Sequence, residues 1–236
     1  MTYDSCDKVL FSADGFGKFG ALDAEEEWDC EARRYYFGIV GKYGAQVQNL
    51  LNVASDLDIQ TICPLHGPIL KENLEHYISQ YDIWSSYKSE TKGVCIIYAS
   101  LHGHTKEAAE LLAKTLTDKG CEKVAISDIA REDMAECVED AFRYDRLVLM
   151  CSTYNMGIFP DMYLFIHKLE ERNFQNKKVA FVENGTWAPQ ANKVMKGLLE
   201  ECKNLEYFNT EVTIKSALDN SSKAALETLA TELCNS

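Results

Sequence analysis

The chain has 236 residues, 46% of them hydrophobic, and 37 acidic side chains against 24 basic ones give a net charge of −13. This hydrophobic content suffices for a packed core and argues against disorder. The acidity disfavours nucleic acid and anionic membrane surfaces as partners, because phosphate contacts supply most of the affinity for nucleic acid. No apolar window approaches the about 20 residues of a membrane helix, and the N-terminus lacks a basic-then-apolar signal sequence.

Nine cysteines are scattered along the chain without any C-x-x-C spacing. The pattern fits neither a disulfide framework nor a thiolate metal site. We therefore expect a reducing, cytoplasmic location and no catalytic cysteine.

The first 90 residues predict two short strands and two helical segments. A strand over residues 9–12 leads into a glycine-rich run at 14–20, and a long helical segment interrupted by glycines follows over 24–57. A second strand covers residues 59–63, and a second helix covers 71–87. Two strands and two helices leave too much apolar surface for an obvious independent domain.

A polar linker is predicted at residues 85–93, and beyond it short apolar runs alternate with amphipathic segments. Continuous apolar runs are typical of strands buried on both faces of a parallel sheet. The runs lie at residues 94–99, 123–127, 147–151, 179–182 and 211–215. Five strand–helix repeats predict an α/β fold with a doubly wound five-stranded parallel sheet.

The first of these strands runs into the loop Ser100-Leu101-His102-Gly103-His104-Thr105, after which a helix begins. Hydroxyls of Ser100 and Thr105 and the free amides of the helix start favour an anion there. The loop lacks the Walker spacing of ATP and GTP sites and the G-x-G-x-x-G spacing of dinucleotide sites. An ordinary strand-to-helix turn with Thr105 as N-cap is the alternative.

Two later strands also end in small, polar and aromatic residues, at 152–160 and 183–189. Open α/β sheets bind ligands beyond the carboxyl ends of their strands, where the strand order switches. Tyr154 and Trp187 are therefore predicted to cover a planar ring, with plain surface packing as the alternative.

Residues 93–236 resemble a flavodoxin domain. The Ser100-x-x-Gly103-x-Thr105 pattern resembles its FMN-phosphate loop, and the two later loops resemble those that hold the isoalloxazine ring. The runs at residues 10–17, 33–36 and 62–69 resemble the final third of the metallo-β-lactamase-like domain of flavodiiron proteins, which precedes a flavodoxin domain in that family. The resemblance implies a C-terminal remnant of that di-iron domain over 1–90 and a complete FMN-binding domain over 93–236.

As implied by the resemblance, the chain is an FMN-binding electron-transfer flavoprotein, the flavodoxin-containing portion of a flavodiiron oxygen or nitric oxide reductase. An electron donor such as a rubredoxin-like protein or a reductase, and a head-to-tail homodimer, are implied as partners. The implied FMN contacts are Ser100, Leu101, His102, Gly103, His104 and Thr105, then Ser152, Thr153, Tyr154, Asn155, Met156 and Gly157, and finally Glu183, Asn184, Gly185, Thr186 and Trp187.

The resemblance also implies two metal ligands, Asp14 as the bridging aspartate and His66 as the last histidine of the iron site. The H-x-E-x-D-H run and the remaining ligands have no counterpart in the chain. Two ligands do not close a di-iron site. We therefore predict that this chain alone holds no competent iron centre.

Three positions in the flavin half carry their own expectations. His102 stands where simple flavodoxins favour threonine, so an imidazole replaces one hydroxyl. Glu183 is expected near the ring edge, where its charge lowers the reduction potential. Gly157 is expected to ease rotation of the neighbouring peptide toward the flavin N5.

Two other functions stay open. One is a complete flavodiiron reductase, if another chain or a segment before Met1 supplies the missing iron ligands. The other is a binding module with a flavodoxin fold and no cofactor.

Overall fold

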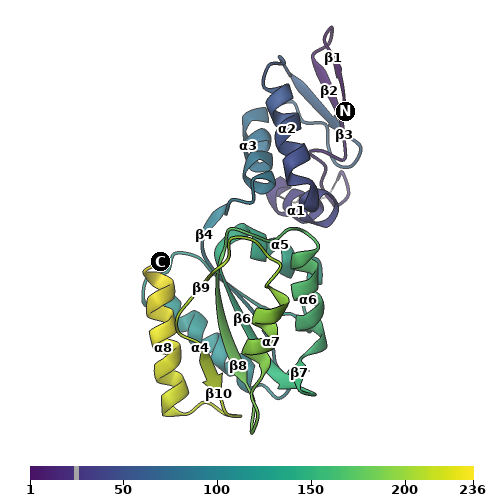
Figure 1. Cartoon of the computed structure of the whole chain (residues 1–236). Coiled ribbons are helices and arrows are strands. Elements are labelled where there is room, and N and C mark those ends of the chain that lie inside the picture. Colours follow the sequence, from purple (N-terminus) through teal and green to yellow (C-terminus); the bar gives the residue numbers. More distant parts are fainter. Residues whose placement is uncertain (24–26) are drawn as a thin grey trace. The chain divides into compact units, whose positions relative to one another are not determined.

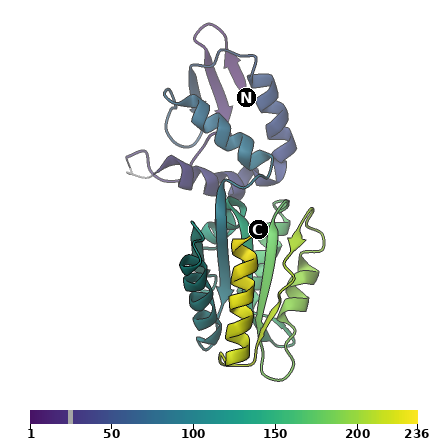
Figure 2. The same cartoon turned by 90° about the vertical axis from the view of Figure 1, so that its left-hand side faces the viewer.

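The computed structural model describes residues 1–23 and 27–236. The chain divides into two compact units, Met1–Glu90 and Thr91–Ser236, which Figures 1 and 2 show from two sides. Residues 24–26, with which the predicted long helical segment begins, lie outside the described residues.

The N-terminal unit contains a three-stranded sheet and helices. Its elements are β1 (Thr2–Asp4), β2 (Val9–Ala13), α1 (Trp28–Tyr35), the π-helix η1 (Tyr36–Val40), the 3-10 helix η2 (Gly41–Tyr43), α2 (Gly44–Ala54), β3 (Thr61–Pro64) and α3 (Leu74–Ser85). The central strand β2 pairs antiparallel with β1 and parallel with β3. Strand β1 was not predicted, because three residues with little apolar character carry no periodic signal.

The long helical segment predicted for residues 24–57 is broken into pieces in the structure. Helix α2 begins at Gly44, where any side chain would collide with the carbonyl oxygen of Ser85 in α3. Glycine is the residue that permits so close a backbone approach. The break therefore follows from the packing of α2 against α3, which the local helical pattern does not contain.

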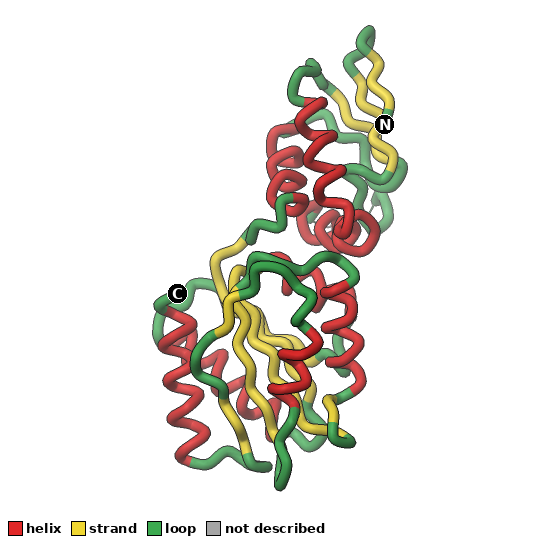
Figure 3. Tube along the Cα trace, in the orientation of Figure 1, coloured by secondary structure: helices red, strands yellow, loops and turns green. Residues whose placement is uncertain are grey.

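The C-terminal unit alternates strands and helices (Figure 3). Its elements are β4 (Thr91–Ala99), α4 (His104–Asp118), β5 (Val124–Asp128), α5 (Met134–Arg143), β6 (Tyr144–Tyr154), β7 (Gly157–Ile158), α6 (Pro160–Glu170), β8 (Lys178–Asn184), α7 (Ala191–Leu198), β9 (Glu206–Tyr207), β10 (Val212–Ile214) and α8 (Asn220–Cys234).

The main strands of this unit pair in parallel in the order β10-β8-β6-β4-β5. Short strands β7 and β9 add to β6 and β8. Helices α4 and α8 cover one face of the sheet, and α5, α6 and α7 cover the other. The predicted α/β fold with a doubly wound parallel sheet is confirmed.

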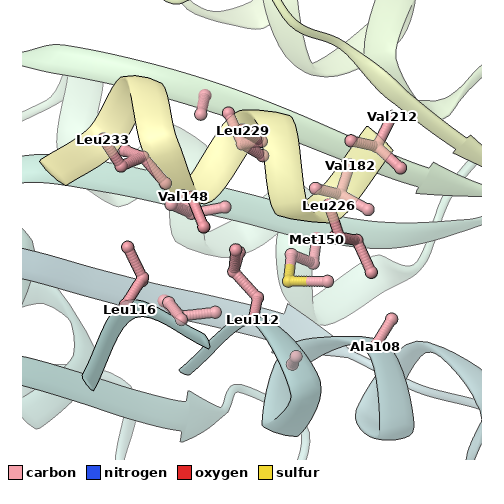
Figure 4. Packing of buried hydrophobic residues seen from close by; sticks show 14 of the residues in the cluster. Ala108, Leu112, Leu116, Val148, Met150, Val182, Val212, Leu226, Leu229 and Leu233 are labelled. Carbon is pink, nitrogen blue, oxygen red and sulfur yellow. The ribbon is translucent and has the colours of Figure 1, made fainter. Parts of the chain in front are cut away.

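The core on the α4–α8 face explains the continuous apolar runs of the central strands. Leu112 of α4 and Leu229 of α8 meet Val148 and Met150 of β6, and all four are fully buried (Figure 4). Alternate residues of the same strands, such as Leu149, are buried on the opposite face. A strand covered on both faces is apolar at successive positions, so its sequence does not alternate between apolar and polar residues.

The strand order also fixes where a ligand can reach the sheet. From β4 the chain crosses to β5 on one side, and the next strand, β6, lies on the other side of β4. The loops that follow β4 and β6 therefore diverge at the carboxyl edge. This switch point is where open α/β sheets bind ligands.

Candidate functional site

A cavity of about 480 Å³ opens at this switch point. Its volume falls within the range of about 300–1,000 Å³ that is typical of small-molecule sites. The cavity is lined by the loops after β4, β6 and β8 and by one residue after β10. The lining residues are Ser100, Leu101, His102, His104, Thr105, Ser152, Thr153, Tyr154, Asn155, Met156, Asn184, Gly185, Thr186, Trp187, Ala188 and Ser216.

The loop after β4 forms the turn into α4. Gly103 adopts a φ of +92°, a left-handed conformation that glycine adopts without strain, and the helix begins at the next residue. The amide of Gly103 donates to Ser100 Oγ at 3.1 Å. Gly103 is the N-cap and offers no side-chain acceptor, so the helix-start amides favour an anion. Thr105 is not the N-cap; its Oγ1 lies 3.1 Å from Ser152 Oγ.

The loop after β6 is a two-residue hairpin turn. Tyr154 pairs with Gly157, and the residues between them, Asn155 and Met156, have φ values of 48° and 62°. Two positive φ values correspond to a type I′ turn, which favours asparagine and glycine. A methionine held in this conformation is strained, and such strain is concentrated at functional sites.

Exposed large side chains gather around the cavity. Trp187 is 89% exposed, Met156 69% and Tyr154 47%, and each lines the cavity. Isolated exposed apolar residues are ordinary, but a cluster beside a cavity marks a binding surface. A flat ring placed against these side chains would bury them.

Polar side chains brace the loops against one another. Thr153 Oγ1 accepts hydrogen bonds from the amides of Gln190 at 2.9 Å and Ala191 at 3.3 Å, which ties β6 to the start of α7. Buried Asn184 clamps Ser216: its Oδ1 accepts from the Ser216 amide at 3.0 Å, and its Nδ2 donates to the Ser216 carbonyl at 2.9 Å. The cavity rim is thereby held in place before any ligand arrives.

Most of the residues predicted from the three loops lie around this one cavity, but Gly103, Gly157 and Glu183 do not line it. Glu183 is buried, and its carboxylate accepts from the Thr213 hydroxyl at 2.9 Å and the Asn192 amide at 3.0 Å. Successive residues of a strand point to opposite faces. Next to Asn184, which faces the rim, Glu183 therefore faces α7, and its carboxylate does not lie at the cavity.

Two lining residues, Ala188 and Ser216, were not predicted. Ala188 lies in the predicted loop at 183–189, directly after the last implied contact, Trp187. Ser216 follows β10, and it reaches the cavity because β10 pairs with β8 and Asn184 holds its backbone. Its position directly after a predicted strand at the same sheet edge was the available signal.

In the N-terminal unit, Asp14 and His66 both lie beside Tyr35. The Tyr35 hydroxyl donates to Asp14 Oδ1 at 3.2 Å, and the Tyr35 and His66 ring centroids are 5.8 Å apart. Burial, followed by the charge and hydrogen bond of Asp14, raises the pKa of Tyr35 to about 12. Among the described residues, no third His, Cys, Asp or Glu joins Asp14 and His66 with ligand atoms within 4.8 Å of one another.

A family model described as "Flavodoxin domain" matches residues 95–220, more than half of the chain. The chain belongs to the flavodoxin domain family. This flavodoxin-domain chain has no described helix that is long and apolar enough to cross a membrane.

Relatives extend the likeness to the N-terminal unit. An uncharacterized protein of Methanocaldococcus jannaschii is 26% identical over 93% of this chain and 59% of its own length. The anaerobic nitric oxide reductase flavorubredoxin of Vibrio vulnificus is 25% identical over 96% of this chain and 47% of its own length. The flavodoxin-domain chain thus spans about half to three fifths of these relatives.

A solved structure, the rubredoxin oxygen:oxidoreductase of Desulfovibrio gigas, matches 99% of the chain with a TM-score of 0.89 at 23% identity, and the match covers 60% of that structure. At this identity the likeness shows the fold. The predicted resemblance to flavodiiron proteins is confirmed.

Proposed function

We propose that this chain binds FMN and transfers electrons, as the flavodoxin-containing portion of a flavodiiron-type oxygen or nitric oxide reductase. The observation that carries the proposal is the cavity at the switch point, with an anion-binding turn on one side and exposed aromatic side chains on the others. Bound FMN would supply the one- and two-electron chemistry, and the protein would supply position and electrostatics.

The residues present fit each part of such a ligand. Hydroxyls of Ser100 and Thr105 and the first amides of α4 suit a phosphate group. Tyr154 and Trp187 suit a planar ring, which they would shield from water. Asn155 and the strained turn around it offer polar backbone groups for the ring edge.

The larger assembly is part of the same proposal. The relatives' names include a flavorubredoxin and a rubredoxin oxygen:oxidoreductase, which supports an electron donor such as a rubredoxin-like protein or a reductase. We propose residues 1–90 as the end of a metallo-β-lactamase-like domain, with Asp14 and His66 as an incomplete set of metal ligands. A head-to-tail homodimer belongs to the same interpretation.

Reconstitution with FMN tests the central claim. The purified chain, mixed with FMN and then desalted, is expected to retain about one flavin per chain, seen as an absorbance band near ~450 nm. Thr105→Val is expected to weaken FMN binding by roughly tenfold, because it removes a hydroxyl from the anion turn. Thr228→Val, an exposed position on α8, serves as the matched control.

Loss of all flavin on desalting, with the fold intact by circular dichroism, would leave a binding module without a cofactor and reject the proposal. Metal analysis of the same preparation addresses the first unit. We expect iron well below two per chain, because Asp14 and His66 are not joined by further ligands among the described residues. Iron near two per chain would instead favour a complete reductase.

A further inference from the structure

The geometry points to His102 and His104 as the residues that make this cavity select a phosphate monoester, with an affinity that rises as their imidazoles gain protons. The inference rests on the proposed function, because it concerns the anion turn of the same cavity. It goes beyond that function because it assigns the selectivity for the phosphate group of the ligand to the side chains of His102 and His104.

The charges around the cavity carry the first step. None of the described lining residues is Lys, Arg, Asp or Glu, so His102 and His104 are the lining side chains that can become cations near neutral pH. The chain as a whole has a net charge of −13, which repels an anionic ligand at long range. Hydroxyls and amides bind a phosphate but do not change charge with pH.

The position of the two imidazoles carries the second step. They flank Gly103 in the turn that leads into α4, and no heavy atom lies within 4 Å of the point where a Gly103 Cβ would be. His102 and His104, on either side of Gly103 in the sequence, both line the cavity. His102 is exposed, and His104 is partly buried.

His104 has an unsatisfied atom at this position. Its Nδ1 is buried and has no hydrogen-bond partner. Glu107, in the same first turn of α4, places its Oε2 3.7 Å from this Nδ1, beyond hydrogen-bond range, on an exposed side chain. A buried polar atom without a hydrogen-bond partner is costly, so a ligand oxygen that reached Nδ1 would gain affinity.

The helix start favours an anion in the turn and disfavours a lone cation there. A phosphate bound at this helix start would attract a cationic side chain beside it. Glu107 lies beside His104 on the helix surface, and the Tyr154 phenol is the remaining titratable group that lines the cavity.

The direction of the pH effect follows from linkage. Binding that favours protonated imidazoles weakens as pH rises through the histidine range of about 5 to 8. A phosphate monoester loses its second charge below about pH 6, so the affinity does not keep increasing in acid. FMN should bind tightest near pH 6.5 and more weakly at pH 8.5, whereas riboflavin, which lacks the phosphate, should show no such trend.

Fluorescence-quenching titrations with FMN and riboflavin at about pH 6.5 and about pH 8.5 test this directly. For the wild-type chain we expect FMN to bind roughly three- to tenfold more tightly at the lower pH, and riboflavin to bind equally at both. The double variant His102→Gln/His104→Gln should remove the FMN trend. The control His167→Gln, an exposed histidine on α6, should keep it.

A second pair of measurements separates charge from hydroxyl contacts. His102→Thr is expected to keep the affinity seen at the higher pH and to lose part of the gain at the lower one. Calorimetry in buffers of different ionisation enthalpy should show proton uptake when FMN binds to the wild-type chain and little uptake in the double variant.

Equal FMN affinity at the two pH values, or an unchanged pH trend in the double variant, would overturn the assignment while leaving FMN binding intact. Binding of neither FMN nor riboflavin would overturn both this inference and the proposed function. The two failures are therefore distinguishable in one set of titrations.

Discussion

The two units of the chain differ in where their exposed apolar side chains lie. In the C-terminal unit both faces of the central sheet are covered, and exposed side chains such as Tyr154, Met156 and Trp187 concentrate around one cavity. In the N-terminal unit Met1, Ile39 and Tyr43 line a smaller cavity of about 280 Å³, while Phe11 on β2 is 51% exposed and Leu65 after β3 73% exposed away from it. Exposed apolar side chains clustered beside a cavity mark a candidate binding surface, whereas single exposed ones do not.

The largest expected difference between the units concerns stability. Leu112→Ala removes a fully buried side chain from the α4–α8 core, and we expect a loss of about 2–5 kcal/mol in the free energy of unfolding of the C-terminal unit. Leu65→Ala makes the same chemical change at an exposed position and should cost less than about 0.5 kcal/mol. Urea unfolding followed by circular dichroism, with a transition fitted for each unit, measures both.

Equal losses for the two leucine variants would break the contrast between the units. They would mean that Leu65 is buried against something in solution. An unchanged urea transition for Leu112→Ala would instead contradict the packing of α4 against α8.

A smaller effect is expected from Glu183, and it sharpens the description of the cavity. Because its carboxylate is bound by Thr213 and the amide of Asn192, Glu183→Gln should destabilise the C-terminal unit by about 1–3 kcal/mol. The reduction potential of bound FMN should not change, because the carboxylate does not line the cavity. Potentiometric titration and urea unfolding check the two parts, with exposed Glu122→Gln as the control.

A positive shift of the potential in Glu183→Gln, without loss of stability, would contradict this assignment. It would restore the expectation from sequence that the charge acts directly on the ring.

The sequence predicts well those features that depend on residues close together in the chain, and poorly those that depend on contacts between distant segments. The apolar runs at 147–151 and 179–182 predict their strands because burial on both faces requires an apolar side chain at every position. The site loops are predictable for a related reason, since parallel strands bring their carboxyl ends to one edge. Ser100 and Trp187 could therefore be placed at one site without knowledge of any contact.

Features that depend on pairing between distant segments could not be read in this way. Ser216 reaches the cavity only because Asn184, on another strand, holds its backbone. Glu183 and Asn184 are adjacent in sequence and point to opposite faces, so the side of the strand decides which of them reaches the rim. The break at Gly44 depends on Ser85, far along the chain.

The smallest expected effect is in the N-terminal unit. It tests whether Tyr35 and Asp14 form their hydrogen bond in solution. Burial, followed by the charge and hydrogen bond of Asp14, raises the pKa of Tyr35 from 10.0 to about 12. An unfolded chain releases the phenolic proton near pH 10, so the resulting stabilisation is complete below that pH and is lost as pH rises from about 10 to about 12. Alkaline titration of tyrosine absorbance, as the difference between wild type and Tyr35→Phe, isolates this phenol.

Asp14→Asn separates the two causes of that shift. Because burial is the larger cause, the variant should lower the Tyr35 pKa only part of the way toward 10. A fall to the ordinary value would assign the whole shift to the carboxylate, and no change would show that the hydrogen bond between Tyr35 and Asp14 does not form in solution. A partial fall would show that the hydrogen bond from Tyr35 holds Asp14 in a fixed position without a metal. A side chain that serves as a metal ligand needs such a partner to orient it.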